Sequence, residues 1–165
     1  MREADRSVVI LMVKDVFVKF LLLLFPLHAI ACSEYVIGFK GLNDVFDHVS
    51  FAQYAEHREA CTQLYKWHQH DQAVSFVEHA KVKYSLYGFS KGAEASFKFM
   101  QRVKHKPEFI VTVGAYSTTN VDFSPFGVKF LNVFDHSGKG QRSPGIHLSV
   151  PHHKIQQEAN KYLIK

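Results

Sequence analysis

Residues 82–95 carry the sequence VKYSLYGFSKGAEA, in which a β-prone run is followed by Gly-x-Ser-x-Gly at 88–92. Small residues after the motif then open a segment with helical spacing. Glycines on both sides of a serine permit a sharp, strained backbone turn that a Cβ would block. A strand before this motif and a helix after it form the setting in which a serine, here Ser90, is presented as a nucleophile. An ordinary Gly-bounded turn between a strand and a helix is the alternative interpretation.

Strand-like and helical segments alternate through the rest of the chain. Apolar strands are expected at 35–39, 82–87, 108–113, 128–134 and 146–150. Helical spacing is expected at 49–79, as two helices joined near His70, and again at 93–103 and 154–164. Apolar strands separated by helices indicate a mostly parallel sheet that is covered on both faces. The sequence therefore predicts an α/β fold, a three-layer sandwich with a reduced, mostly parallel sheet of about five strands and a hairpin-like return before the last strand.

The composition excludes several classes of protein. The chain has 165 residues, 47% hydrophobic and 21% charged, which is typical of one globular domain and not of a disordered chain. Its net charge of +5 comes from scattered Lys and Arg residues, so nucleic acid is not an expected partner. Two cysteines are too few for a disulfide-rich scaffold, and the Cys-x-x-Cys pattern of a zinc site is missing. We therefore expect no metal and no other cofactor.

The first 31 residues have the pattern of a secretory signal peptide. Two lysines precede the apolar run FLLLLFPL at 20–27, and Ala-Ile-Ala follows at 29–31. A basic leader, a short apolar run and an Ala-x-Ala site are the parts of such a peptide, and the run is too short to span a membrane. We expect residues 1–31 to be removed and residues 32–165 to form one exported domain, periplasmic or secreted. A start at Met12 would give a leader of ordinary length.

Cys32 follows the predicted cleavage site. Lipidation at this residue would place the protein at a membrane, and we expect membrane association in that case alone. In an oxidising compartment Cys32 could instead pair with Cys61. The alternative to a leader, a buried strand at 8–13 with a core helix at 17–27, also stays open.

A serine nucleophile needs a general base and a carboxylate that orients the base. Asp135 is the preferred acid, because it follows a predicted strand at the end where parallel sheets place functional groups. Asp122, in a polar stretch, is the alternative acid. His152 is the preferred base, because it lies in the loop between the last strand and the last helix, and the neighbouring His153 is the alternative.

With Ser90, Asp135 and His152 in this order, the chain resembles a small member of the α/β-hydrolase superfamily. The sequence HHKI at 152–155 is similar to the His-Asn-Asp-Ile turn of some bacterial hydrolases, which favours His152 over its neighbour. The resemblance covers most of residues 35–165 and implies a single α/β-hydrolase-like domain.

The segment YVIGFKGL at 35–42 resembles the strand and Phe-Arg-Gly-Thr turn of class 3 (fungal-type) lipases. In that family the residue after the glycine supplies an oxyanion N–H, which implies this role for Leu42. Lys91, which follows the serine, would supply the other.

These residues predict a serine hydrolase of the esterase, lipase or thioesterase kind that forms an acyl-enzyme. Its substrate would be a small-molecule or lipid ester, or a thioester. The alternative is a non-catalytic α/β-hydrolase-like binding or surface protein.

Overall fold

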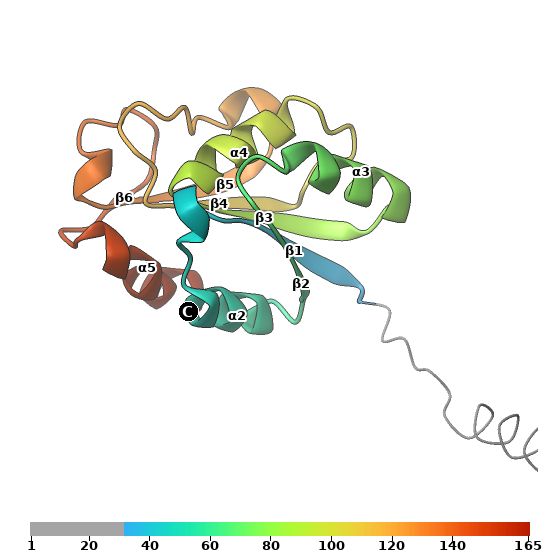
Figure 1. The fold of residues 1–165 in the computed structure, drawn as a ribbon, viewed down its shortest axis with the longest axis horizontal. Coiled ribbons are helices and arrows are strands. Elements are labelled where there is room, and N and C mark those ends of the chain that lie inside the picture. Colours follow the sequence, from blue (N-terminus) through green and yellow to red (C-terminus); the bar gives the residue numbers. More distant parts are fainter. Residues whose placement is uncertain (1–31) are drawn as a thin grey trace, which may run out of the picture. The chain divides into compact units, whose positions relative to one another are not determined.

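A computed structural model describes residues 32–165, which Figure 1 draws in colour. Its centre is one six-stranded sheet in the order β2-β1-β3-β4-β5-β6, and every neighbouring pair of strands is parallel. The strands are β1 (Glu34–Phe39), β2 (Cys61–Tyr65), β3 (Lys83–Phe89), β4 (Phe109–Val113), β5 (Lys129–Phe134) and β6 (Ile146–His147). The predicted parallel α/β fold is confirmed.

Helices cover both faces of this sheet. Helices α3 (His70–Ala80) and α4 (Lys91–Met100) lie on one face, and α2 (His48–His57) and α5 (Ile155–Leu163) lie on the other (Figure 1). Successive side chains of a strand point to opposite faces. In β1, Ile37 accordingly belongs to the core under α3 and α4, and Val36 to the core under α2 and α5. The three layers are therefore held by two apolar cores.

The segment at 49–79 differs from the two predicted helices, because its middle is the edge strand β2. Helix α2 ends at His57, and Glu59 then turns the chain with a φ of 52°. Five residues are too few to distinguish a helical period from a strand, so Cys61, Leu64 and Tyr65 matched the wrong pattern. Backbone pairing with β1 makes this segment a strand.

The last strand also differs from the prediction. β6 has only two residues, and it runs parallel to β5, with Phe134 opposite His147. The connection between them is therefore a crossover and not a hairpin-like return. The chain leaves the sheet after Leu148, whose N–H still donates to the Phe134 carbonyl at 2.7 Å.

A disulfide joins Cys32 to Cys61, at the start of the neighbouring strands β1 and β2. The pairing that the sequence left open is thus formed. Lipidation of Cys32 would need the same sulfur, so one molecule cannot carry both. The predicted leader at 1–31, with its start at Met12, lies outside the described residues. In the described domain, no helix is long and apolar enough to cross a membrane.

Candidate active site

Ser90 lies at the junction where β3 ends and α4 begins. Its backbone has a φ of 54° and a ψ of −116°, and a positive φ is strained for a residue with a Cβ. The Ser90 N–H donates to the Val113 carbonyl of β4 at 2.9 Å, which holds the turn against the next strand. The residue is 3% exposed. The motif therefore forms a strained turn between a strand and a helix, which is the setting of a nucleophile elbow.

The two glycines of the motif are required by packing. A Cβ at Gly92 would lie 2.0 Å from the Phe39 carbonyl oxygen at the end of β1. A Cβ at Gly88 would lie 2.7 Å from the Gly92 carbonyl oxygen and 2.9 Å from Cα of Ala93. Glycine therefore lets the first turn of α4 approach both β3 and the end of β1.

The same approach brings Lys91 toward the turn that follows β1. Lys91 opens α4, and Leu42 opens the 3₁₀ helix η1 (Leu42–Asp44). The first N–H groups of a helix have no carbonyl partner within it, so both backbones can offer a donor. The Lys91 side chain is held elsewhere: its Nζ pairs with Glu94 and lies 5.5 Å from the centre of the Trp67 ring.

A cavity of about 280 Å³ opens beside this turn. Two residues of its wall, Asn43 and Asp44, have positive φ, 55° and 59°. The cavity is lined by Leu42, Asn43, Asp44, Lys66, Trp67 and His68. Its lining thus includes Leu42, one of the two predicted oxyanion donors.

Asp135 follows β5 directly, and its carboxylate is fully buried. Its Oδ1 accepts hydrogen bonds from the Ser137 N–H at 2.7 Å and the Ser137 hydroxyl at 2.6 Å. Its Oδ2 is hydrogen-bonded to Nδ1 of His152. Burial alone would raise the pKa of Asp135, but the hydrogen bonds from His152 and Ser137 outweigh it and lower this pKa below its ordinary value. The carboxylate is therefore ionised at neutral pH.

An ionised carboxylate only accepts hydrogen bonds, so Nδ1 of His152 carries the proton that it shares with Asp135. The other ring nitrogen, Nε2, is then free to accept a proton. The ring is stacked between two aromatic side chains, Phe89 and Tyr116, each with its centre 5.1 Å away. Phe89 is the residue before Ser90, so the imidazole lies beside the strained turn.

The alternative candidates lie apart from this arrangement. Asp122 is exposed, and its Oδ1 accepts the Ser124 N–H at 3.0 Å at the start of η2 (Ser124–Phe126). His153 is exposed in η4 (His152–Lys154). The structure thus brings together Asp135 and His152, next to the residue before Ser90. The catalytic roles of these residues stay predictions.

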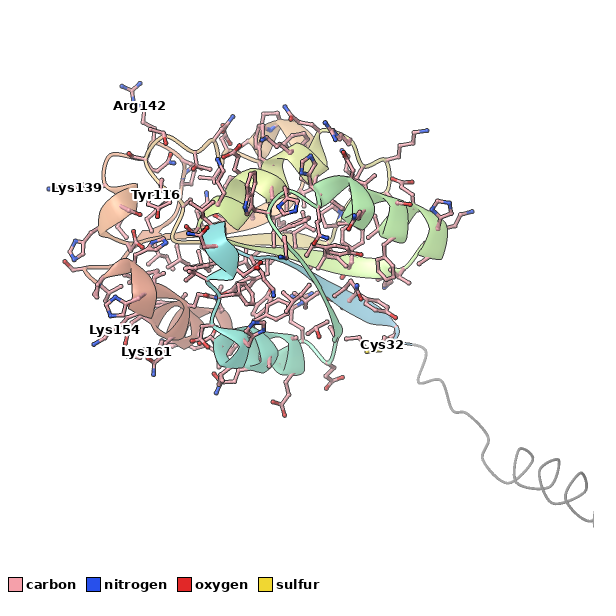
Figure 2. All side chains as sticks on the ribbon, in the orientation of Figure 1. Cys32, Tyr116, Lys139, Arg142, Lys154 and Lys161 are labelled. Atoms are coloured by element: carbon pink, nitrogen blue, oxygen red, sulfur yellow. A yellow bond between two sulfur atoms is a disulfide. The ribbon has the colours of Figure 1, made fainter. Side chains whose placement is uncertain are left out.

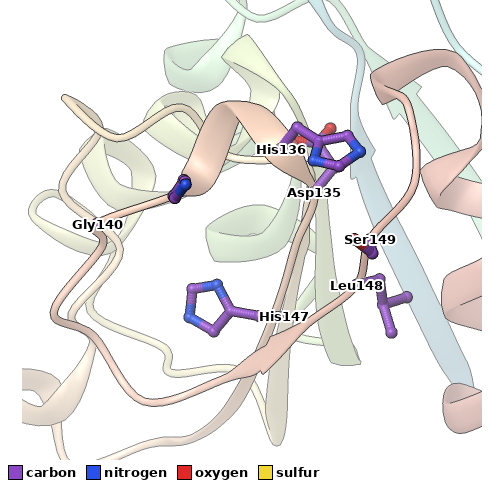
Figure 3. A pocket seen from close by; sticks show the side chains of 7 residues that line it. Asp135, His136, Gly140, His147, Leu148 and Ser149 are labelled. Atoms are coloured by element: carbon purple, nitrogen blue, oxygen red, sulfur yellow. The ribbon is translucent and has the colours of Figure 1, made fainter.

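A second cavity, of about 400 Å³, lies against Asp135 and is shown in Figure 3. Its lining consists of Asp135, His136, Lys139, Gly140, His147, Leu148 and Ser149. The His147 ring stacks on Phe134, with ring centres 4.7 Å apart. This cavity borders the loop that holds the carboxylate, and Ser90 is not part of its lining. Among residues 32–165, no group of three or more His, Cys, Asp or Glu side chains could hold a metal ion.

The sequence did not predict three residues that hold the His152 ring in place. Ser137 fixes the carboxylate, Tyr116 covers one face of the imidazole, and Gly114 makes room for it. Gly114 has a φ of 66°, and a Cβ there would lie 3.0 Å from Cε1 of His152. A glycine directly after a predicted strand was the one visible signal.

No protein-family model and no curated protein matches this chain. Two solved structures share its fold. The first is a protein from Xanthomonas campestris pv. campestris assigned to the hydrolases of the α/β superfamily, with a TM-score of 0.59 and 10% identity over 80% of this chain and 96% of its own. The second is an α/β serine hydrolase homologue from Coxiella burnetii, with a TM-score of 0.55 and 15% identity over 80% of this chain and 84% of its own.

At such low identities the likeness establishes the fold alone. The chain has the fold of α/β-hydrolases, in a six-stranded, parallel form. The resemblance to class 3 lipases around residues 35–42 stays a prediction.

Proposed function

We propose that this protein is a serine hydrolase that acts on carboxylic ester or thioester bonds. The observation that carries the proposal is the His152 ring, which is hydrogen-bonded to the buried, ionised Asp135 and stacked on the residue before Ser90. This arrangement supplies a nucleophile, a base and a group that fixes the tautomer of the base. The fold shared with two proteins of the α/β-hydrolase class supports the same conclusion.

In the proposed reaction the Ser90 hydroxyl attacks the acyl carbon, and Nε2 of His152 takes the hydroxyl proton. The tetrahedral oxyanion is held by the N–H groups of Lys91 and Leu42, and such a donor contributes roughly 2.7–4 kcal/mol in enzymes where it has been removed. The C–O or C–S bond to the leaving group then breaks, and His152 gives its proton to the alcohol or thiol. Water attacks the acyl-Ser90 ester in the same way and releases the acid.

We infer the substrate class from the edge of the sheet where the carboxyl ends of the strands lie. Within residues 32–165, β1, β3 and β5 are each followed at this edge by turns and helices, and no further domain is inserted there. An open site favours small or exposed acyl groups. The cavity next to Leu42 is the place we assign to part of such a substrate.

We also propose that the protein is exported. The leader pattern at 1–31 supports export, and so does the disulfide between Cys32 and Cys61, because disulfides persist in oxidising compartments. N-terminal sequencing of the mature protein should begin at Cys32. An intact Met1 or Met12 on cytosolic protein would contradict this proposal.

A fluorophosphonate probe tests the nucleophile, because it reacts with activated serines and not with serines in general. The wild-type protein should become labelled on Ser90 and hydrolyse p-nitrophenyl esters, and Ser90→Ala should abolish both. Ser124→Ala is a matched control at an exposed serine and should keep both. Folded wild-type protein that neither reacts with the probe nor turns over short and long acyl esters or thioesters would contradict the hydrolase function and favour a binding protein.

The same probe distinguishes the two neighbouring histidines. His152→Ala should abolish labelling of Ser90, because the His152 imidazole is stacked on Phe89 beside Ser90, whereas His153→Ala should leave a substantial rate. The reverse pattern would move the role of the base by one residue.

A further inference from the structure

We propose that Tyr116 is a positioning residue for His152, and this role rests on the hydrolase function proposed above. The Tyr116 ring lies over the imidazole at a centre-to-centre distance of 5.1 Å, with 22° between the planes. Phe89 is stacked on the imidazole at the same distance, with 27° between the planes. Both aromatic rings are therefore stacked on the imidazole.

Stacking on two aromatic rings limits how the imidazole can move. The hydrogen bond to Asp135 fixes one ring atom, but the ring can still tilt about that contact. Flat contacts with Phe89 and Tyr116 oppose the tilt and keep Nε2 in place. Catalysis depends on this, since a shift of the order of 1 Å in a reacting group can reduce a rate about 100-fold.

Hydrogen bonds fix the backbone at Tyr116 to the loop after β5, which contains Asp135. The Ser117 N–H donates to the Ser137 carbonyl at 3.0 Å, and the Gln141 side chain donates to the Tyr116 carbonyl at 2.8 Å. Ser137 is also the residue that binds the Asp135 carboxylate. Hydrogen bonds therefore join the backbone at Tyr116 to the loop that contains Asp135. In Figure 2, Tyr116 lies at the end of the domain opposite Cys32.

Tyr116 also covers the imidazole from solvent. The residue is itself 43% exposed. Its face nevertheless covers an imidazole that is only 29% exposed. Covering this ring keeps water from the hydrogen bond between His152 and Asp135, and the two π-faces favour the imidazolium that forms during the reaction. Both effects stabilise the transition state, so losing them should lower kcat.

The test uses Tyr116→Leu, which removes the ring, and Tyr116→Phe, which removes only the hydroxyl. Tyr162→Leu is the matched control, because Tyr162 is similarly exposed at 46% and lies in α5. With p-nitrophenyl acetate, Tyr116→Leu should lower kcat about tenfold, the upper range of what an aromatic pair contributes, and leave KM within about twofold. Tyr116→Phe and Tyr162→Leu should keep the wild-type kcat.

A second measurement follows the stacking without turnover. The His152 ring is stacked on two aromatic rings, so we expect their ring currents to shift the NMR signal of its Cε1 proton upfield. In the Ser90→Ala background, Tyr116→Leu should move this signal downfield, and Tyr116→Phe should not.

The outcomes separate this role from the function on which it rests. An unchanged kcat in Tyr116→Leu, or an unmoved signal, would overturn the positioning role while the hydrolase remains. A Tyr116→Phe variant as slow as Tyr116→Leu would assign the effect to the hydroxyl and also overturn it. Wild-type protein without turnover would refute the hydrolase and the role together.

Discussion

Two glycines with nearly the same positive φ allow the support of the His152 ring to be measured. Gly114, after β4, has a φ of 66°, and Gly127, after η2, has a φ of 67°. A Cβ at Gly114 would lie 3.0 Å from Cε1 and 3.2 Å from Nδ1 of His152 and 3.0 Å from Cγ2 of Ile155, whereas a Cβ at Gly127 would have nothing within 4 Å. Gly114→Ala and Gly127→Ala therefore both place an alanine at a positive φ, and only the first crowds its neighbours.

The positive φ sets the stability loss that both variants share. An alanine at such a φ is disfavoured by about 1–2 kcal/mol, so Gly127→Ala should lose that much free energy of unfolding, and Gly114→Ala, which also crowds His152 and Ile155, should lose at least as much. In a domain of this size the loss lowers Tm by roughly 4–8 °C. Gly114→Ala should also push the His152 ring by a few tenths of an ångström, because contacts of 3.0–3.2 Å are tighter than van der Waals contact. We expect kcat to fall about tenfold in this variant alone.

The assay combines thermal unfolding followed by circular dichroism with steady-state hydrolysis of p-nitrophenyl acetate at 25 °C, below both transitions. A wild-type kcat in Gly114→Ala, with the expected fall in Tm, would show that the ring is not held at this position during the reaction. An equal fall of kcat in Gly127→Ala would assign the effect to general loss of stability. Either result would refute the reasoning.

Three further outcomes are expected. Asp135→Asn should keep the fold and lower kcat by about 10⁴, because the base then takes the wrong tautomer, whereas Asp122→Asn should be nearly silent. The pKa of Asp135 is lowered in the folded state, so its contribution to stability is present above its unfolded pKa and is lost as the pH falls through the folded pKa. Urea titrations from pH 5 to pH 2 should therefore show a smaller loss in Asp135→Asn than in wild type; an equal loss would contradict the shift. Reducing the Cys32–Cys61 disulfide, which spans 29 residues, should lower the free energy of unfolding by about 3–4 kcal/mol, and a change under 1 kcal/mol would contradict its structural role.

The parts of the site that follow from short stretches of sequence could be predicted. The turn at Ser90 is fixed by glycines that leave no space for a Cβ, and this requirement is visible in the motif itself. Asp135 could be placed because the carboxyl ends of parallel strands gather at one edge of a sheet. His152 could be placed by its position after the last strand, although β6 is shorter and differently connected than predicted.

Strand β2 could not be predicted, because no local pattern specifies it. Among its five residues only Tyr65 is buried, and at the sheet edge they pair with β1 alone. A left-handed turn at Glu59 precedes it, and this residue type gives no sign of a positive φ. The pairing partner is 26 residues away in register, Tyr35 with Cys61, so the contact is set by the folded sheet.

The contacts that hold the His152 ring are also set by the folded structure, and the sequence therefore did not predict them. The loops after β4 and β5 meet so closely that a Cβ at Gly138 would lie 2.9 Å from the Ala115 carbonyl oxygen. This approach places the Tyr116 ring over His152 while Ser137 fixes the carboxylate on the other side of the hydrogen bond. No pairwise spacing in the sequence encodes that meeting. The turn that carries Ser90, the proposed nucleophile, thus depends on one local motif, whereas the orientation of His152, its proposed base, depends on the contact between two loops.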